Sequence, residues 1–346
     1  MKMQKTKIYI VCPEIKVPTG GVKQLYKLAE TLSRNNMDVS LVHGKKGFRI
    51  NWFETDVSIE YFPFLFHKIN KLTRKKKAKY IFKDFFKLLL MDKSLPGRDA
   101  VIIYPEVYGP DVHTLLENRY IVYNQNCYYT FNLFPFMQKK EVDTYSSSRF
   151  KGFLTVSQDS ANYLSQAFPG KKIERIGLGL HPVFSYSDKK EKIIAFMPRK
   201  LKEDVNQIYQ ILSDYPELKE WKWMPIDNKT EEQVAELLKK SALFLSFNFN
   251  EGFGLPPVEA MACGCYVIGY AGNAGTEYFL PEFSSRVADR NILEFADKIK
   301  EKVTEFNQNP LSLINQGKKA SDFVRSSYTL QREEADSLKA IKNLLS

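Results

Sequence analysis

Short runs of apolar, β-branched residues alternate with segments of helical periodicity along the whole chain. In the first half, the predicted helices between these runs include Val22–Arg34 and Ser160–Phe168. The runs themselves are Ile8–Cys12, Val39–His43, Ile59–Phe62, Ala100–Tyr104, Tyr120–Tyr123 and Phe153–Val156. This alternation predicts a parallel sheet with helices on both faces.

A second series follows the turn-rich stretch 177–192. Its predicted helices are Val205–Tyr215, ended by Pro216, and Thr230–Lys240, which Thr230 and Gln233 begin as a capping box. Its predicted strands are Ile193–Met197, Trp221–Pro225, Ala242–Phe247 and Tyr266–Gly269. The sequence therefore predicts an α/β protein of two Rossmann-like, doubly wound parallel-sheet domains that face an inter-domain cleft. We expect domains at 1–180 and 190–327, and a C-terminal helix at 328–346 that crosses back to the first.

Length and composition agree with this organisation. The 346 residues suit two domains, and 44% hydrophobic with 26% charged residues indicates globular folding. No apolar run approaches the roughly 20 residues that span a bilayer, and Met1–Lys7 leads directly into a strand. The four cysteines are too few and too scattered for a disulfide framework. A cytoplasmic location is predicted.

The segment Phe249–Gly264 carries the clearest chemical pattern. It reads as strand, glycine turn and short helix, with Gly252 and Gly254 allowing close approach of a ligand and Pro256-Pro257 suiting a first helical turn. Backbone N–H groups at a helix start bind phosphate. Glu251 on the loop suits hydrogen bonds from sugar hydroxyls, and Glu259 in the helix suits a vicinal diol such as ribose.

This segment resembles the family-four retaining glycosyltransferases, which have the GT-B fold. Their signature is Glu-(seven residues)-Glu within E-G-F-G-L-P-x-x-E-A-M-A-x-G, and about thirteen positions agree here. The resemblance implies a nucleotide-sugar donor and donor contacts from Gly252, Phe253, Gly254, Leu255 and Glu259. It also matches Gly20 and Gly21 to the glycine loop near the donor, and Arg199 to the cation that stabilises the leaving diphosphate.

Two positions depart from that family. Its second cation, five residues after the arginine, is Asp204 here, so Lys200 or Lys202 would have to substitute. Its histidine near the transferred sugar is missing from the corresponding stretch, where Asn126 is either a sugar ligand or a turn residue. No Asp-x-Asp pair is present, which favours metal-independent transfer without a cofactor.

The resemblance implies transfer with retention of configuration. The acceptor that we expect is a glycan or a lipid-linked saccharide, in surface polysaccharide synthesis. Catalytic roles would fall to Glu251, Arg199 and Asn126. Metal ligands are not expected.

The first 100 residues hold 21 Lys and Arg against 9 Asp and Glu, which indicates an anionic partner for this half. Arg74–Leu90 reads as a basic amphipathic helix, a pattern typical of peripheral contact with an anionic membrane surface at its inner face. The bland alternative is a core-packed helix with a solvated lysine face.

Two other interpretations stay open. Nucleic acid is the second candidate partner, as for a glycosyltransferase of modified bases in phage DNA, although a single basic helix is less typical of that than a basic groove. The third interpretation is a non-catalytic subunit that binds a sugar or nucleotide, which Asp204 and the missing histidine support.

Overall fold

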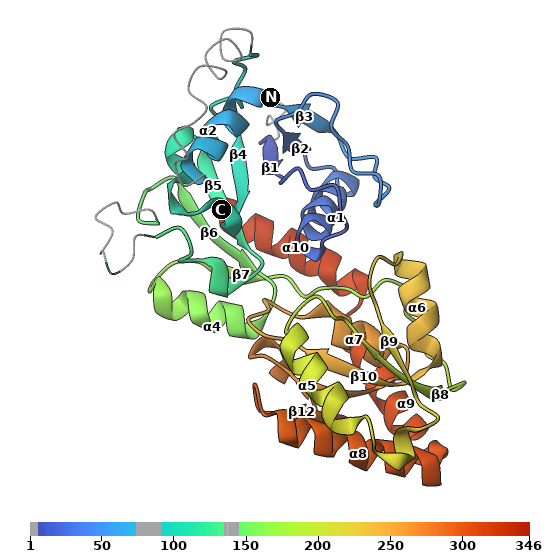
Figure 1. Ribbon diagram of the computed structural model, residues 1–346. Coiled ribbons are helices and arrows are strands. Elements are labelled where there is room, and N and C mark those ends of the chain that lie inside the picture. Colours follow the sequence, from blue (N-terminus) through green and yellow to red (C-terminus); the bar gives the residue numbers. More distant parts are fainter. Residues whose placement is uncertain (1–5, 74–90, 135–136, 138–144) are drawn as a thin grey trace. The chain divides into compact units, whose positions relative to one another are not determined.

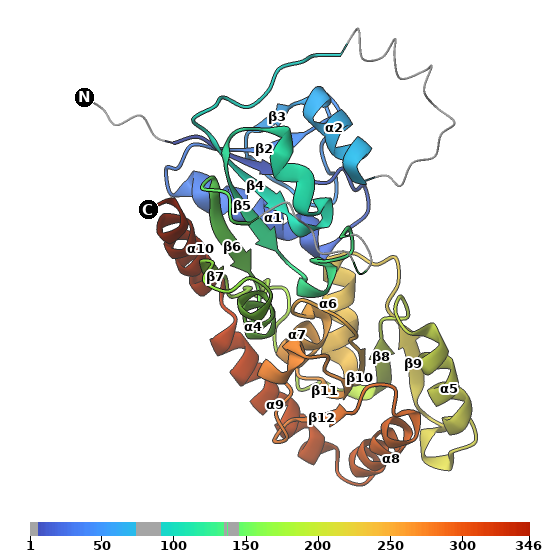
Figure 2. The ribbon, with the colours of Figure 1, turned by 90° about the vertical axis from the view of Figure 1, so that its left-hand side faces the viewer.

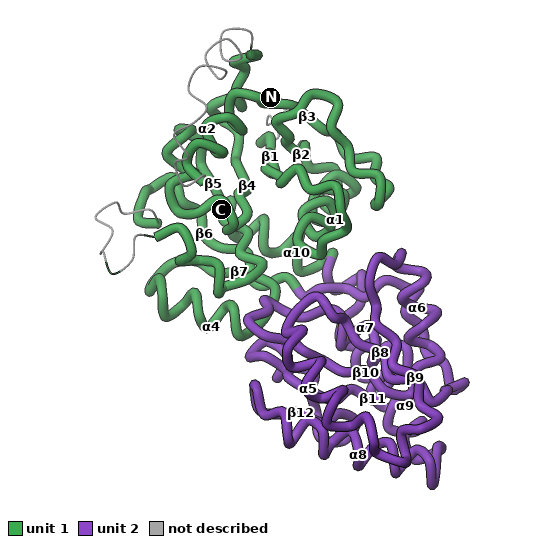
Figure 3. Tube along the Cα trace, in the orientation of Figure 1, with its two compact units in different colours: residues 1–176, 334–346 green, residues 177–333 purple. Residues whose placement is uncertain are grey.

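The computed structural model describes residues 6–73, 91–134, 137 and 145–346 of the chain (Figure 1). It divides into two compact units, residues 1–176 with 334–346, and residues 177–333 (Figure 3). Each unit is an α/β structure built on one parallel sheet, as the apolar and helical pattern predicts.

The sheet of the first unit has the order β3-β2-β1-β4-β5-β6-β7. Its strands are β1 Ile8–Val11, β2 Val39–His43, β3 Ile59–Tyr61, β4 Val101–Pro105, β5 Arg119–Asn124, β6 Phe150–Thr155 and β7 Ile173–Arg175. The strand order reverses between β1 and β4, which pair directly from Ile8↔Val101 onward. The short edge strand β7 was not predicted, because three half-buried residues carry too little apolar signal.

Helices cover both faces of this sheet. They are α1 Gly20–Arg34, α2 Pro63–Thr73 and α4 Gln158–Ala167, with 3-10 turns η1 Glu106–Tyr108, η2 Pro110–Leu115 and η3 Cys127–Tyr129. One face packs α2, η2 and α4 against the sheet through a cluster rich in aromatic side chains, among them Phe66, Tyr104, Tyr120 and Phe153.

The last helix, α10 Leu330–Leu345, belongs to the first unit from Glu334 onward. There Glu334 accepts a hydrogen bond from Asn35 at the end of α1 (2.7 Å), and Asn343 donates to Glu174 of β7 (3.1 Å). Figure 2 shows this part of α10 beside β6 and β7. The first helical residue of α10 is Leu330, two residues after the predicted start at Tyr328, which is the C-cap of the preceding helix.

The second unit has a five-stranded sheet of order β12-β11-β10-β8-β9. Its strands are β8 Glu191–Phe196, β9 Lys222–Pro225, β10 Ser241–Phe247, β11 Tyr266–Tyr270 and β12 Ser284–Val287. The last of these was not predicted, because its sequence Ser-Ser-Arg-Val has a single apolar residue. The order reverses between β8 and β10.

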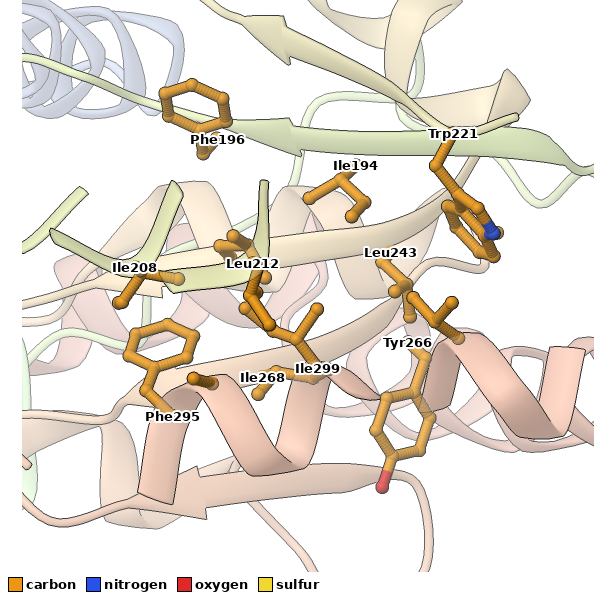
Figure 4. Close-up of a cluster of buried hydrophobic side chains, with 14 of the residues drawn as sticks. Ile194, Phe196, Ile208, Leu212, Trp221, Leu243, Tyr266, Ile268, Phe295 and Ile299 are labelled. Carbon is orange, nitrogen blue, oxygen red and sulfur yellow. The ribbon is translucent and has the colours of Figure 1, made fainter. Parts of the chain in front are cut away.

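Its helices are α5 Lys202–Leu212, α6 Glu231–Lys240, α7 Leu255–Ala262, α8 Ile292–Gln308 and α9 Pro310–Ser327, with turns η4 Pro216–Leu218 and η5 Ala274–Glu277. The capping box of Thr230 and Gln233 is confirmed. The predicted end of the helix before Pro216 is wrong: α5 starts earlier, ends at Leu212, and Pro216 begins η4. Figure 4 shows the core between α5, α8 and the sheet, where Ile208, Leu212, Phe295 and Ile299 meet Ile194 and Ile268.

Candidate functional site

The reversal of strand order between β8 and β10 defines the candidate site in the second unit. In open parallel sheets, ligands bind outside the carboxyl ends of the strands at this point. Two loops lie there: residues 197–201 after β8, which hold Arg199 and Lys200, and residues 248–254 after β10, which hold Glu251. Topology alone therefore brings the predicted cationic loop and the predicted acidic loop to the same edge of the sheet.

Side-chain geometry joins the two loops directly. The Nζ of Lys200 donates to Oε1 of Glu251, and both side chains are partly exposed, by 33% and 26%. The pair thus remains open to a ligand. This contact also distinguishes Lys200 from Lys202, which is exposed at the start of α5 and lines a pocket with Phe196, Tyr209 and Trp223. Arg199 is exposed on the same loop.

Tyr278, a buried residue that follows η5, holds the glycine turn in place through hydrogen bonds. Its hydroxyl lies 2.8 Å from the carbonyl of Phe253 and 2.9 Å from that of Gly254, and the side chain of Asn248 donates to it at 3.3 Å. Burial raises the pKa of Tyr278 well above its ordinary value, so the hydroxyl keeps its proton and donates. The position of the acidic loop is therefore fixed by the core of its own unit.

The structure gives a reason for glycine at position 254 that the sequence did not indicate. Its φ of +83° lies in the left-handed region, and a Cβ there would meet Asn248 Nδ2 at 2.2 Å and Tyr278 Oη at 2.7 Å. Gly254 therefore makes room for the two buried residues that hold the loop. A role in close approach to a ligand, which the sequence indicated for Gly252 and Gly254, stays a prediction for both.

The predicted short helix is α7, which begins directly after Gly254. Leu255 is its first residue, Pro256 and Pro257 follow in the first turn, and Glu259 lies one turn further on and is half-buried. Phe253 is buried, with its ring centroid 5.5 Å from that of Tyr278 and 5.2 Å from that of Tyr328. Glu251 and Glu259 thus belong to one continuous loop-and-helix segment at the end of β10.

Loops at this edge also share an uncommon backbone. Leu201, Asn228, Asn250 and Arg290 have φ between 51° and 65°, and they follow β8, β9, β10 and β12 respectively. Asparagine adopts this conformation readily, whereas for Leu201 and Arg290 it costs free energy, and such strain gathers at functional sites. The strain at Leu201 and Arg290 supports a ligand site along the carboxyl edge.

Asp204, which stands where the resembling family has lysine, is buried and 2% exposed. Its Oδ1 lies 2.5 Å from Nη1 of Arg290, and its Oδ2 accepts the hydroxyl proton of Tyr270 at 2.9 Å. A buried carboxylate requires such partners. Neither Arg290 nor Tyr278 was predicted as a site residue, because their partners lie 86 and up to 30 positions away and no local motif marks them.

The first unit has its own reversal point, between β1 and β4. Glu106 begins η1 at the end of β4, and its carboxylate accepts the backbone N–H groups of Gln125 and Asn126 at 3.1 Å each. Burial raises the pKa of Glu106 to about 7, and the backbone N–H groups of Gln125, Asn126 and Glu106 itself lower it only in part. The sequence did not point to this residue, which lies in an otherwise apolar stretch.

Glu106 holds the segment that contains Gln125 and Asn126, and the glycine loop lies next to this segment. The side-chain oxygen of Asn126 accepts the N–H of Tyr128 at 3.1 Å, so it caps η3. Gly20 and Gly21 begin α1, and a Cβ on Gly21 would lie 2.9 Å from Oε1 of Gln125. The turn role considered for Asn126 is thus visible, and a sugar contact stays a prediction.

Residues 223–320 match the family model described as Glycosyl transferases group 1, and this range contains the loops after β10, β11 and β12. Among solved structures, sucrose-phosphate synthase from Thermosynechococcus elongatus is similar with a TM-score of 0.67 at 14% identity, over 99% of both chains. The fold is GT-B. TarM of S. aureus, in a complex that includes UDP, gives 0.65 at 12% identity over 99% of this chain and 100% of that one. HepE of Anabaena, in complex with UDP and glucose, gives 0.62 at 13% over 97% and 99%.

A curated relative is the alpha-1,6-glucosyltransferase of Actinobacillus pleuropneumoniae serotype 7, which is 27% identical over 195 residues. The match spans 54% of this chain and 57% of that protein. The predicted basic helix Arg74–Leu90 lies outside the residues that the structure describes. Of the helices in the described ranges, none has the length and apolar character to cross a bilayer.

Proposed function

We propose that this GT-B protein is a retaining glycosyltransferase that uses a nucleotide-sugar donor, with the donor site on its second unit. The observation that carries the proposal is the contact between Lys200 and Glu251 across the reversal point of the sheet. It lies at the loops on which a nucleotide ligand binds in such sheets, and Glu251 falls within the range that matches the glycosyltransferase family model.

Four predicted residues of the second unit have roles consistent with their places. Glu251 would accept hydrogen bonds from hydroxyls of the donor sugar, and Glu259, one turn into α7, would bind the ribose diol. Arg199 and Lys200 would neutralise the diphosphate as it leaves. Lys200 would then exchange part of its contact with Glu251 for phosphate oxygen, which its partial exposure permits.

The reaction proposed is a front-face transfer. The bond between the anomeric carbon and the β-phosphate oxygen breaks, and the acceptor oxygen bonds to the same face of the sugar. The acceptor proton passes to the leaving phosphate oxygen, so no protein nucleophile and no metal is required. UDP-glucose is the first donor to test, because it is the kind of ligand that complexes of similar folds contain.

The acceptor we propose is a glycan or a lipid-linked saccharide of a surface polysaccharide. Support comes from the similarity to a glucosyltransferase and from the basic, amphipathic sequence 74–90, which would place the enzyme at an anionic membrane surface. Salt-dependent binding to vesicles containing anionic lipid, compared with duplex DNA, separates this surface from a nucleic-acid partner.

The test is release of UDP from a panel of UDP-sugars by the purified chain, with and without EDTA. We expect turnover in both conditions, and its loss in Glu251→Gln. Glu282→Gln, at an exposed acid in the same unit, is the matched control and should leave turnover unchanged. Full turnover by Glu251→Gln would refute the role of Glu251, and absence of hydrolysis or transfer with every donor would favour a non-catalytic binding subunit.

A further inference from the structure

Arg290 and Asp204 form an ion pair that joins the loop after β12 to the first turn of α5. The two residues are 86 positions apart, and the distance between Nη1 and Oδ1 is 2.5 Å. The second carboxylate oxygen of Asp204 is occupied by the hydroxyl of Tyr270, at the end of β11. Asp204 therefore has both oxygens engaged inside the fold.

The two ends of this pair differ in exposure. The Asp204 side chain is 2% exposed, whereas that of Arg290 is 52% exposed. A guanidinium has five N–H donors in a planar fork, and one bond to Asp204 leaves others for a ligand. Asp204 thus anchors a cation whose remaining donors are open at the surface of the unit.

A second contact fixes the direction of the arginine. The Cζ of Arg290 lies 5.6 Å from the ring centroid of Phe249, two residues before Glu251, and that ring is 39% exposed. Arg290 itself has a left-handed backbone, with φ of 65°. The ion pair and the ring together hold the guanidinium against the acidic loop, on the edge that carries Arg199 and Lys200.

The exposure and shape of the guanidinium suit an anionic ligand. Lys200 and Arg290 are each paired with a carboxylate, so the charge of both cations is partly compensated before any ligand binds. Arg290 is the more exposed of the two side chains, at 52% against 33%. A diphosphate brings several oxygens with geometry that matches the guanidinium fork, and such bonds are among the strongest in proteins.

We infer that Arg290 binds the diphosphate of the donor and that Asp204 is the positioning residue that presents it. This inference rests on the proposed function, which it deepens by identifying a further cation of the site beside Arg199 and Lys200. It gives a physical reason for an acid at position 204: the cation comes from a distant loop, and the acid holds it in place.

The test compares the affinities of UDP, uridine and inorganic pyrophosphate by calorimetry and ligand-observed NMR. Arg290→Gln should weaken the binding of UDP and pyrophosphate about 10- to 100-fold, the range for one or two charge-assisted hydrogen bonds. The affinity for uridine should be unchanged. Arg290→Lys should recover part of the loss. Arg286→Gln, at an exposed arginine of β12, is the matched control and should bind like the wild type.

Each other outcome has a defined meaning. Equal UDP affinity in Arg290→Gln, or an equal loss for uridine, would overturn the inference, because the pair would then only shape the loop. If the wild type bound pyrophosphate through Arg290 but no nucleotide, the proposed function would fail while the anion site remained. If it bound neither, both would be refuted. Should Arg290→Gln not fold, Arg290→Lys and Asp204→Asn carry the comparison, with reduced pyrophosphate affinity expected and unchanged affinity contradicting the inference.

Discussion

Lys200 contacts Glu251 across the reversal point of the second sheet, 51 positions away in sequence. The contact connects the loop after β8 with the loop after β10, so the two charged segments that the sequence marks separately form one site. The contact also distinguishes the two candidate lysines. Lys200 faces the acidic loop, whereas Lys202 lines the pocket beside Trp223.

We predict that Lys200→Met impairs donor binding far more than it impairs folding. Because both side chains are partly exposed, removal of the ion pair should change the free energy of unfolding by only about 0–1 kcal/mol. Loss of a phosphate contact should weaken UDP-glucose about tenfold or more. Lys202→Met is the matched control, measured by calorimetry and chemical denaturation. An equal loss of affinity in both variants would contradict the assignment.

Tyr278→Phe tests whether the acidic loop depends on the buried hydroxyl. The variant keeps the ring but leaves the carbonyls of Phe253 and Gly254 without their shared donor, so we expect a loss of about 1–3 kcal/mol in the free energy of unfolding. Turnover should fall with it, since Glu251 lies on that loop. Tyr209→Phe, at an exposed tyrosine, should change neither quantity. Normal turnover in a destabilised Tyr278→Phe would show that activity does not depend on the hydrogen bonds of the Tyr278 hydroxyl.

Glu106 makes the stability of the first unit depend on pH. Its folded-state pKa is raised from about 4.5 to about 7, so the folded state binds the extra proton. The stabilising contribution of Glu106 to the free energy of unfolding is therefore complete below pH 4.5. It is lost as pH rises through 7, by about 3 kcal/mol in all. Glu106→Gln should abolish this dependence. The check is the difference in free energy of unfolding between the two proteins from pH 5 to pH 8.5; a constant difference would show that the carboxyl titrates normally.

Asn126 can be assigned by two substitutions. If its main role is to cap η3, Asn126→Ser keeps an acceptor for the N–H of Tyr128 and should retain stability and turnover, whereas Asn126→Ala should lose about 1 kcal/mol. If it binds the transferred sugar, both variants should lose turnover alike while serine retains stability. Denaturation and UDP-release assays on the pair decide between these roles.

Much of the fold was predictable because its signals are local. Apolar runs such as Val39–His43 and the capping box at Thr230 depend on neighbouring residues, and the structure confirms both. The weak edge strands β7 and β12 escaped, since their stability comes from pairing with a neighbour and not from their own sequence.

The residues of the candidate site also divide into those that a local motif marks and those that it does not. The loop-and-helix segment around Glu251 and Glu259 is contiguous, so a motif identifies it. Tyr278, Arg290 and Glu106 act through partners distant in sequence, and only the folded chain brings those partners together. Asp204 illustrates the difference: as a departure from a motif it counted against function, whereas in the structure it anchors a cation.

The central claim is that a nucleotide sugar binds at the carboxyl edge of the second sheet. The most direct measurement is a crystal structure of the protein soaked with UDP-glucose. The account predicts a diphosphate against the loop of Arg199 and Lys200, with the sugar next to Glu251 and the ribose next to Glu259. A nucleotide bound elsewhere, with the 248–254 loop free of ligand, would contradict it.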